Sequence, residues 1–174
     1  CSELEHAFDF AIAELRHSEK NRDLVHALKY QRQRHLGPML AKLMAQRFHS
    51  DERFREGDWL LVPTPLHWTR RLKRHFNQSQ DLASHLAKAI DKPCLPLLKR
   101  VRGTATQTRL SRKGRLTNLE SAFKLRRSLV GEGAVNVIVV DDVLTTGSTA
   151  HECAKTLKRE PNIEKVVVLT LLRG

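Results

Sequence analysis

The chain has 174 residues, of which 40% are hydrophobic and 29% are charged. That length suits one ordinary domain with a single core, and no apolar run approaches the roughly 20 residues that a membrane-spanning helix requires. Lys and Arg number 31 against 19 Asp and Glu, which gives a formal net charge of +12. This excess favours polyanionic partners, and both phosphorylated ligands and nucleic acids qualify.

Cysteine and histidine usage argues against a self-contained metal centre. Cys1, Cys94 and Cys153 are too few and too widely spaced for a disulfide framework or a zinc site, so we expect idle thiols. The nine histidines lack the supporting Cys, Asp or Glu spacing of a metal site. The chain does not begin with Met and shows no signal-peptide pattern, so we expect a fragment of a longer cytoplasmic protein.

Three helices are predicted in the first 50 residues. Ser2 and Glu5 have capping-box spacing and apolar residues recur behind them at helical intervals, so the chain is expected to open with an amphipathic helix. These apolar residues are Leu4, Phe8, Ala11, Ile12 and Leu15. A second helix is expected across residues 24–28, and a third follows Gly37 and Pro38.

The middle of the chain changes to a strand, a helix and a loop. The apolar run 59–62 predicts a buried strand that ends in a proline-fixed loop. Residues 77–90 predict a helix with a small-residue face, and a short extended stretch follows at 94–98. Residues 101–118 are almost free of large apolar side chains, which predicts a long mobile loop.

The last third of the chain predicts a strand, a helix and a second strand. Residues 137–140 are uniformly apolar, as expected of a central parallel strand, and a helix at 148–159 and a strand at 166–172 follow. Alternating strands and helices predict an α/β domain with an open, mostly parallel sheet flanked by helices. The single domain would have a helical N-terminal part over about residues 1–50 and a core over about 57–174.

The segment after the strand at 137–140 carries the chemistry. Asp141 and Asp142 would lie at the strand's carboxyl end, where ligands bind in open α/β sheets, and we expect both carboxylates at the surface. The hydroxyl residues and Gly147 that follow would present N–H groups to a phosphate at the next helix start. Carboxylates accept hydrogen bonds from sugar hydroxyls, so the pattern indicates a ribose phosphate. The alternative is an ordinary acidic pair before a capped helix.

Residues 137–149 resemble the 5-phosphoribosyl-1-pyrophosphate (PRPP) signature of type I phosphoribosyltransferases. That signature has four apolar residues, two acids, an aliphatic residue, any residue, two hydroxyls, Gly, any residue and a hydroxyl, and this chain fits it at every position. A wider resemblance is carried by Leu28–Tyr30, Val62–Leu66, Phe76–Gln78, Gln107–Ser111, Arg115, Asn118 and Ala122–Phe123. In these segments the chain is also similar to the ComF family of competence-associated phosphoribosyltransferase-like proteins.

The resemblance implies a type I phosphoribosyltransferase-like fold with a PRPP site. Asp141 and Asp142 would hold the ribose 2′ and 3′ hydroxyls, with Mg²⁺ brought by PRPP near them, and the hydroxyl-rich turn would wrap the 5-phosphate. The complete set of PRPP-binding candidates is Asp141, Asp142, Val143, Leu144, Thr145, Thr146, Gly147, Ser148 and Thr149. The pyrophosphate loop would comprise Pro63, Thr64 and Pro65, where family backbones can adopt a cis peptide, with Lys29 beside it.

Residues 100–118 resemble the flexible catalytic loop of these enzymes. The catalytic candidates on it are Arg109, Arg112, Lys113 and Arg115, for each of which a solvated face is the alternative. Two departures from the family stand out. His75 takes a position that is commonly Gly, and only Cys1 could remain of the four-cysteine zinc module with which members commonly begin. Any zinc would belong to such a module.

Two functions are open on the sequence alone. The first is transfer of phosphoribosyl from PRPP to an unknown acceptor with release of pyrophosphate, a glycosyltransferase reaction of nucleotide metabolism, in a protein associated with DNA uptake. The second is a non-catalytic, PRPP-responsive DNA-binding or scaffold protein of the competence machinery. Arg70, Arg71, Lys73 and Arg74 are candidates for binding single-stranded DNA. An aromatic content of 5% argues against a dedicated nucleic-acid module.

Overall fold

The computed structural model describes residues 6–16, 18–30, 34–66, 76–102, 119, 121–129 and 133–174. Its centre is a four-stranded sheet in the order β1-β6-β5-β2, in which every neighbouring pair is parallel. The four strands are β1 (Phe10–Leu15), β6 (Ile163–Arg173), β5 (Val135–Leu144) and β2 (Trp59–Pro63). The open, mostly parallel sheet predicted from the sequence is confirmed.

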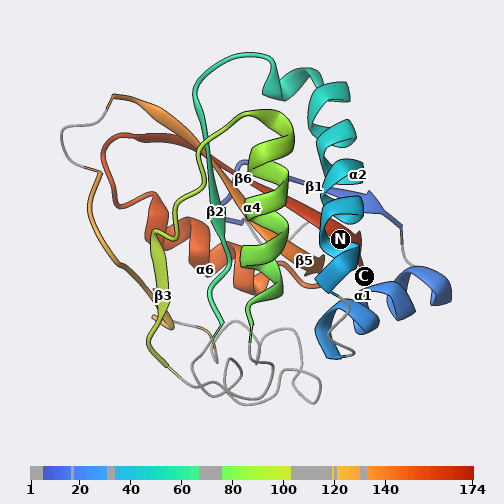
Figure 1. Ribbon diagram of the computed structural model, residues 1–174. Coiled ribbons are helices and arrows are strands. Elements are labelled where there is room, and N and C mark those ends of the chain that lie inside the picture. Colours follow the sequence, from blue (N-terminus) through green and yellow to red (C-terminus); the bar gives the residue numbers. More distant parts are fainter. Residues whose placement is uncertain are drawn as a thin grey trace.

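Helices cover both faces of this sheet (Figure 1). One face carries α2 (Gly37–Ser50) and α4 (Gln78–Ile90), which pack against each other, and α1 (Glu19–Tyr30) adds Val25 to the same core. The other face carries α6 (Ser148–Leu157). Two short 3₁₀ helices, η1 (Arg34–Leu36) and η2 (Glu52–Phe54), flank α2. The two layers give the domain two hydrophobic clusters, one on each side of the sheet.

The strand β5 is apolar on both sides because it separates these two clusters. Val137 and Val139 pack into the cluster under α6, whereas Ile138 and Val140 pack into the cluster under α2 and α4. All four side chains are fully buried. Successive side chains of a strand point to opposite faces, so a central strand covered on both faces must be apolar at every position.

A second, two-stranded sheet lies on the α6 side and was not predicted. Its strands β3 (Leu98–Arg100) and β4 (Phe123–Leu125) are antiparallel. Leu98 and Phe123 are buried in the same cluster as α6. β4 escapes sequence analysis because a three-residue strand with Lys124 at its centre has no apolar run to detect.

The predicted opening helix is wrong. The residues around Ile12 form β1, which pairs with β6 at the edge of the sheet. Phe10 and Ile12 pack on the α2 side while Phe8 and Ala11 pack on the α6 side. A strand with apolar residues on both faces also places them three and four positions apart, and this mimics helical spacing.

The other elements from Glu19 onward agree with the prediction in type and approximate position. Asn77 forms the N-cap of α4, and Cys94 forms an isolated parallel bridge with Leu61 of β2.

Within the described ranges, no helix is long and apolar enough to cross a membrane.

Candidate functional site

The carboxyl ends of β5 and β2 bring the two predicted ligand-binding segments together. These strands are adjacent and parallel, with Pro63 opposite Val140. Directly after β2, the backbone N–H of Thr64 donates to the carbonyl oxygen of Val140 at 3.0 Å. The start of the predicted pyrophosphate loop therefore lies immediately beside the residue that precedes the acidic pair.

The turn between β5 and α6 forms a cradle of unpaired N–H groups. Gly147 adopts a left-handed conformation with φ of +74°, and α6 begins at the next residue without a side-chain cap. Within the part of the chain that the structure describes, nothing accepts a hydrogen bond from the N–H groups of Gly147, Ser148 and Thr149. A helix start of this kind offers several donors and a positive dipole end to an anion.

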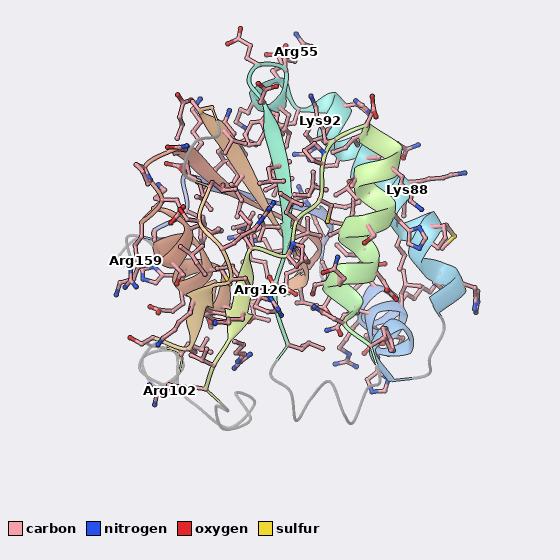
Figure 2. All side chains as sticks on the ribbon, turned by 60° about the vertical axis from the view of Figure 1, so that its left-hand side comes forward. Arg55, Lys88, Lys92, Arg102, Arg126 and Arg159 are labelled. Atoms are coloured by element: carbon pink, nitrogen blue, oxygen red, sulfur yellow. The ribbon has the colours of Figure 1, made fainter. Side chains whose placement is uncertain are left out.

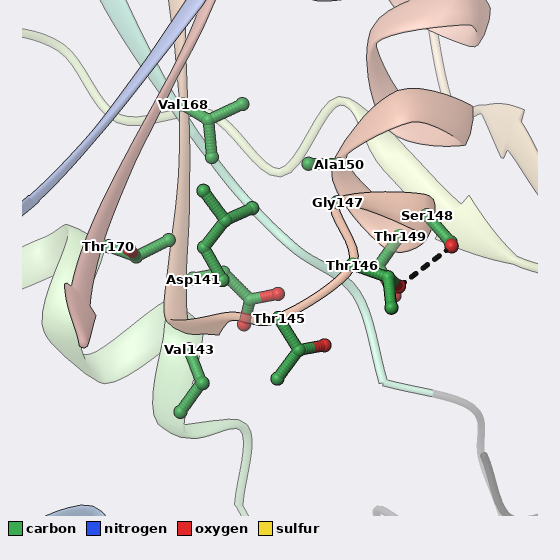
Figure 3. A pocket seen from close by; sticks show the side chains of 11 residues that line it. Asp141, Val143, Thr145, Thr146, Gly147, Ser148, Thr149, Ala150, Val168 and Thr170 are labelled. Atoms are coloured by element: carbon green, nitrogen blue, oxygen red, sulfur yellow. Dashed lines mark hydrogen bonds between the residues drawn. The ribbon is translucent and has the colours of Figure 1, made fainter. Parts of the chain in front are cut away.

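Hydroxyl groups line the same pocket (Figure 3). The hydroxyl oxygens of Thr146 and Ser148 lie 2.9 Å apart and share a hydrogen bond. Asp141 lines the pocket on the strand side, and Val168 and Thr170 of β6 form its floor. The pocket thus combines N–H donors, hydroxyls and one carboxylate at one end of the sheet.

The acidic pair is held by the first turn of α4. The amide of Gln78 donates from Nε2 to Oδ2 of Asp142 at 3.0 Å, and the hydroxyl of Ser79 donates to Oδ1 of Asp141 at 2.8 Å. The backbone N–H of Asp142 donates to the same Asp141 oxygen at 2.9 Å. Asp142 is only 4% exposed, so the expectation of two surface carboxylates is wrong for this residue. Only Asp141 is partly exposed at the pocket.

Asn77 ties the predicted pyrophosphate loop to the same turn. Its side-chain oxygen accepts a hydrogen bond from the Ser79 N–H at 3.2 Å, and its Nδ2 donates to the Thr64 carbonyl at 3.0 Å. The Phe76–Gln78 segment therefore fixes both the loop and the acidic pair. Sequence analysis singled this segment out but assigned it no role.

The segment before β1 covers the back of the cradle. A Cβ atom placed on Gly147 would lie 2.8 Å from Cε1 of His6, so only glycine fits there without movement of that ring. His6 stacks on Phe8, and the Ala7 N–H donates to Nδ1 of His151 at 3.1 Å. Sequence analysis missed this packing, because nothing local in the sequence connects residues 6–8 with the start of α6.

The surroundings of the two described cysteines disfavour their thiolate forms. Burial raises the pKa of the Cys153 thiol well above its ordinary value, and nearby Asp141 raises it further. Burial also raises the pKa of Cys94. A raised pKa favours the protonated form of both thiols at neutral pH. Among the described residues, no three His, Cys, Asp or Glu side chains are grouped to hold a metal ion.

Several predicted residues cannot be placed. The catalytic and nucleic-acid candidates and His75 lie outside the described residues, and Lys29 lies in α1 with its side chain not described. These catalytic and nucleic-acid candidates are Arg109, Arg112, Lys113, Arg115, Arg70, Arg71, Lys73 and Arg74.

The peptide bonds around Thr64 are trans, and no cis peptide occurs in the described segments, so the cis bond that the resemblance allows there is not found.

Sequence comparison places the chain among competence proteins. It is 35% identical over 154 residues to Competence protein F of Haemophilus influenzae, an alignment that covers 87% of this chain and 67% of that protein. The chain belongs to the ComF family. Within this family it is 41% identical over 144 residues to the DNA utilization protein YhgH of Salmonella typhimurium, covering 78% of this chain and 60% of that relative.

A more distant ComF relative is Competence protein ComFC of Bacillus subtilis, which is 34% identical over 116 residues, or 67% of this chain and 45% of that protein. The chain thus spans about two thirds of Competence protein F and less of the other two relatives.

No family model matches the chain. Among solved structures, a hypoxanthine phosphoribosyltransferase from Staphylococcus aureus aligns with a TM-score of 0.43 at 16% identity, covering 88% of this chain and 65% of that one.

Proposed function

We propose that this ComF-family chain binds PRPP at the carboxyl edge of β5. The observation that carries the proposal is the set of unpaired N–H groups at Gly147, Ser148 and Thr149 beside the partly exposed carboxylate of Asp141. N–H donors at a helix start favour a phosphate, whereas a carboxylate repels one and accepts hydrogen bonds from hydroxyl groups. A ligand that satisfies both must carry a phosphate and a polyol within one small molecule, as a ribose phosphate does.

Each part of PRPP has a counterpart on this edge. The 5-phosphate would lie in the cradle, where the Thr146 and Ser148 hydroxyls add further donors. The ribose hydroxyls would bond the Asp141 carboxylate, whose Oδ1 is already held by Ser79 and which is therefore pre-oriented. The pyrophosphate would lie beside Thr64, because that residue is bonded to the strand directly before the acidic pair.

The Asp141 carboxylate also fits the Mg²⁺ that accompanies PRPP. Mg²⁺ prefers oxygen ligands and usually binds one or two carboxylates together with substrate phosphates. Asp141 supplies such oxygens at the pocket, whereas Asp142 is buried and would act by orienting the strand end through its hydrogen bond with Gln78. When bound, Mg²⁺ would neutralise charge on the pyrophosphate oxygens.

Transfer of the phosphoribosyl group to an acceptor is the proposed reaction. Pyrophosphate leaves the anomeric carbon while positive charge develops on the sugar, and cationic side chains would stabilise the negative charge on the leaving group. Arg109, Arg112, Lys113 and Arg115 are the sequence-based candidates for that role. The alternative is a PRPP-responsive protein of the competence system that binds the ligand without turnover, as a sensor or scaffold.

Calorimetry with PRPP and Mg²⁺ tests the binding proposal. The wild-type chain should release or absorb heat on titration, whereas Asp141→Asn combined with Asp142→Asn should bind at least ten-fold more weakly. Asp58→Asn is a matched control, since Asp58 is exposed at the opposite end of β2. Equal affinity in the double variant and the wild type would contradict the assignment of the site.

A pyrophosphate-release screen over free bases separates the two functions. Release that depends on both PRPP and one base, and that the double variant abolishes, would establish transfer. PRPP binding with no release for any base would favour the non-catalytic alternative.

A further inference from the structure

The residues just before β1 are attached to the start of α6 at the back of the phosphate cradle. The backbone N–H of Ala7 donates to Nδ1 of His151 at 3.1 Å, across 144 residues of sequence. The backbone N–H of His151 itself donates to the carbonyl oxygen of Gly147 at 2.7 Å and closes the first turn of α6. His151 therefore connects Ala7 with the glycine of the cradle.

The His6 ring lies against Gly147 as part of the same segment. It stacks on Phe8 with the ring centroids 4.6 Å apart, and it makes a T-shaped contact with the His151 ring at a centroid separation of 6.1 Å. A Cβ atom on Gly147 would approach Nε2 of His6 to 3.1 Å and Cε1 more closely still. The ring is thus a wall behind the left-handed turn that carries the unpaired N–H groups.

The other end of this segment is fixed independently of the cradle. The N–H of Asp9 donates to the Val166 carbonyl at 2.8 Å, and the Asp9 carboxylate accepts from the Val166 N–H at 2.8 Å. Nζ of Lys158, at the far end of α6, donates to the same carboxylate at 2.9 Å. Loss of the Ala7 bond would therefore release residues 6–8 at the cradle while residue 9 stays in place.

The position of Glu152 favours one tautomer of His151. A ring nitrogen that accepts a hydrogen bond has no proton, so the neutral ring carries its proton on Nε2. Nε2 lies 3.8 Å from Oε1 of Glu152, and this carboxylate attracts an N–H dipole that points toward it. The opposite tautomer would set a lone pair against the carboxylate and an Nδ1–H against the Ala7 N–H.

Glu152 is held in this position by contacts of its own. It is only 6% exposed, its Oε2 accepts from the Ser121 N–H at 3.2 Å, and Nζ of Lys155 lies 4.0 Å from Oε1. A carboxylate away from water acts more strongly on a neighbouring dipole than a solvated one, because the local dielectric constant is lower. The described residues therefore form a chain of contacts from Ser121 through Glu152 and His151 to Ala7.

We propose that His151 and Glu152 are positioning residues of the phosphate cradle. Glu152 keeps the ring proton of His151 on Nε2, Nδ1 then anchors Ala7, and this anchor holds the His6 ring against Gly147. The N–H groups of the turn are thereby oriented before a phosphate arrives, which reduces the entropy lost on binding. Neither His151 nor Glu152 lines the pocket, so both act through the turn. The effect on PRPP affinity rests on the proposed function, whereas the tautomer and the order of the turn belong to the free chain.

Nitrogen NMR of the His151 ring tests the tautomer without any ligand. At mildly alkaline pH the wild type should show an unprotonated Nδ1 and a protonated Nε2. In Glu152→Gln the amide oxygen can stay with the Ser121 N–H, so the amide N–H₂ faces His151. The ring proton should then move toward Nδ1, and the Ala7 amide resonance should shift. A protonated Nδ1 in the wild type would overturn the proposal, and an unchanged tautomer in Glu152→Gln would overturn the role of Glu152.

Two substitutions of His151 separate positioning from packing. The oxygen of His151→Asn reaches the place of Nδ1 and keeps the acceptor for Ala7, whereas the oxygen of His151→Gln reaches toward the place of Nε2. His151→Gln should lower the NMR order parameter of the Gly147 N–H in the free chain. It should also weaken PRPP binding by about three- to ten-fold, the effect of one net hydrogen bond. His151→Asn should recover most of both losses, and equal behaviour of the two variants would overturn the proposal.

A control variant and the two readouts keep the proposals apart. Arg159→Gln changes an exposed side chain beyond the far end of α6 (Figure 2) and should alter neither readout at physiological salt, where a distant charge is screened. Wild type that shows the expected tautomer and order parameters but binds no PRPP would contradict the proposed function and support the positioning of the turn. PRPP binding of wild-type strength in His151→Gln, with an unchanged order parameter at Gly147, would overturn the positioning role and leave the PRPP site intact.

Discussion

The side chain of Gln78 donates a buried hydrogen bond to the carboxylate of Asp142, with 3.0 Å between Nε2 and Oδ2, across 64 residues of sequence. Its neighbour Ser79 bonds Asp141 in the same way. The acidic pair at the end of β5 is therefore oriented by the helix that follows the predicted pyrophosphate loop. A displacement of the α4 start would move both proposed halves of the PRPP site together.

Removing the Asp142 carboxylate should destabilise the fold. In Asp142→Ala the buried Gln78 amide loses its acceptor, and a buried unsatisfied polar group costs about 1–3 kcal/mol. Asp142→Asn keeps an acceptor oxygen at this position and should cost clearly less. Urea unfolding of both variants measures the difference in the free energy of unfolding. Equal losses in the two variants would show that the hydrogen bond to Gln78 contributes nothing to stability.

Alanine at Gly147 should damage both the fold and the cradle. A residue other than glycine in the left-handed region costs on the order of 1–3 kcal/mol, and the new methyl group would lie against the His6 ring. Adding His6→Ala removes the steric clash but not the backbone strain. The double variant should recover part of the lost stability in urea unfolding, and no recovery would mean that His6 does not limit the space at Gly147.

Substitutions of Asn77 should separate helix capping from loop tethering. Asn77→Asp keeps the oxygen that accepts the Ser79 N–H but loses the donor to the Thr64 carbonyl, whereas Asn77→Ala loses both. Both variants should weaken PRPP binding in calorimetry, because both release the loop. Only the alanine variant should lose the roughly 1 kcal/mol that an N-cap contributes. Unchanged PRPP affinity in Asn77→Asp would contradict the role of the tether.

Glu160 should contribute stability that depends on pH. A hydrogen bond from the Ser128 hydroxyl, together with one from the Leu129 N–H, holds the pKa of Glu160 below its ordinary value of 4.5. A depressed pKa gives stability that is fully present above the unfolded-state value and is lost as the pH falls through the folded-state value. Glu160→Gln should therefore flatten the loss of stability below pH 4.5. Urea midpoints of variant and wild type at neutral and acidic pH check this, and parallel profiles would contradict it.

Patterns confined to short stretches of sequence predicted much of this molecule. The apolar run before Asp141 predicted β5 as a central strand, and the turn around Gly147 was singled out as the candidate phosphate cradle. Both are local features, since a strand covered on two faces and a helix start each have a short signature. The type of element at Ile12 was wrong, because apolar residues on both faces of β1 imitate helical spacing.

Interactions between distant segments escaped prediction for a physical reason. The hydrogen bond between Gln78 and Asp142 and the packing of His6 on Gly147 depend on how the sheet orders its strands. No periodicity encodes such pairs in one sequence. The burial of Asp142 follows from the same order, because β2 and α4 cover the strand end that local analysis placed at the surface.

A crystal structure of the chain with PRPP and Mg²⁺ tests the central claim most directly. We predict the 5-phosphate within hydrogen-bond distance of the N–H groups of Gly147, Ser148 and Thr149, with the ribose hydroxyls against Asp141. The pyrophosphate should lie beside Thr64. A PRPP molecule bound elsewhere on the chain, or an empty cradle at saturating PRPP, would contradict the claim.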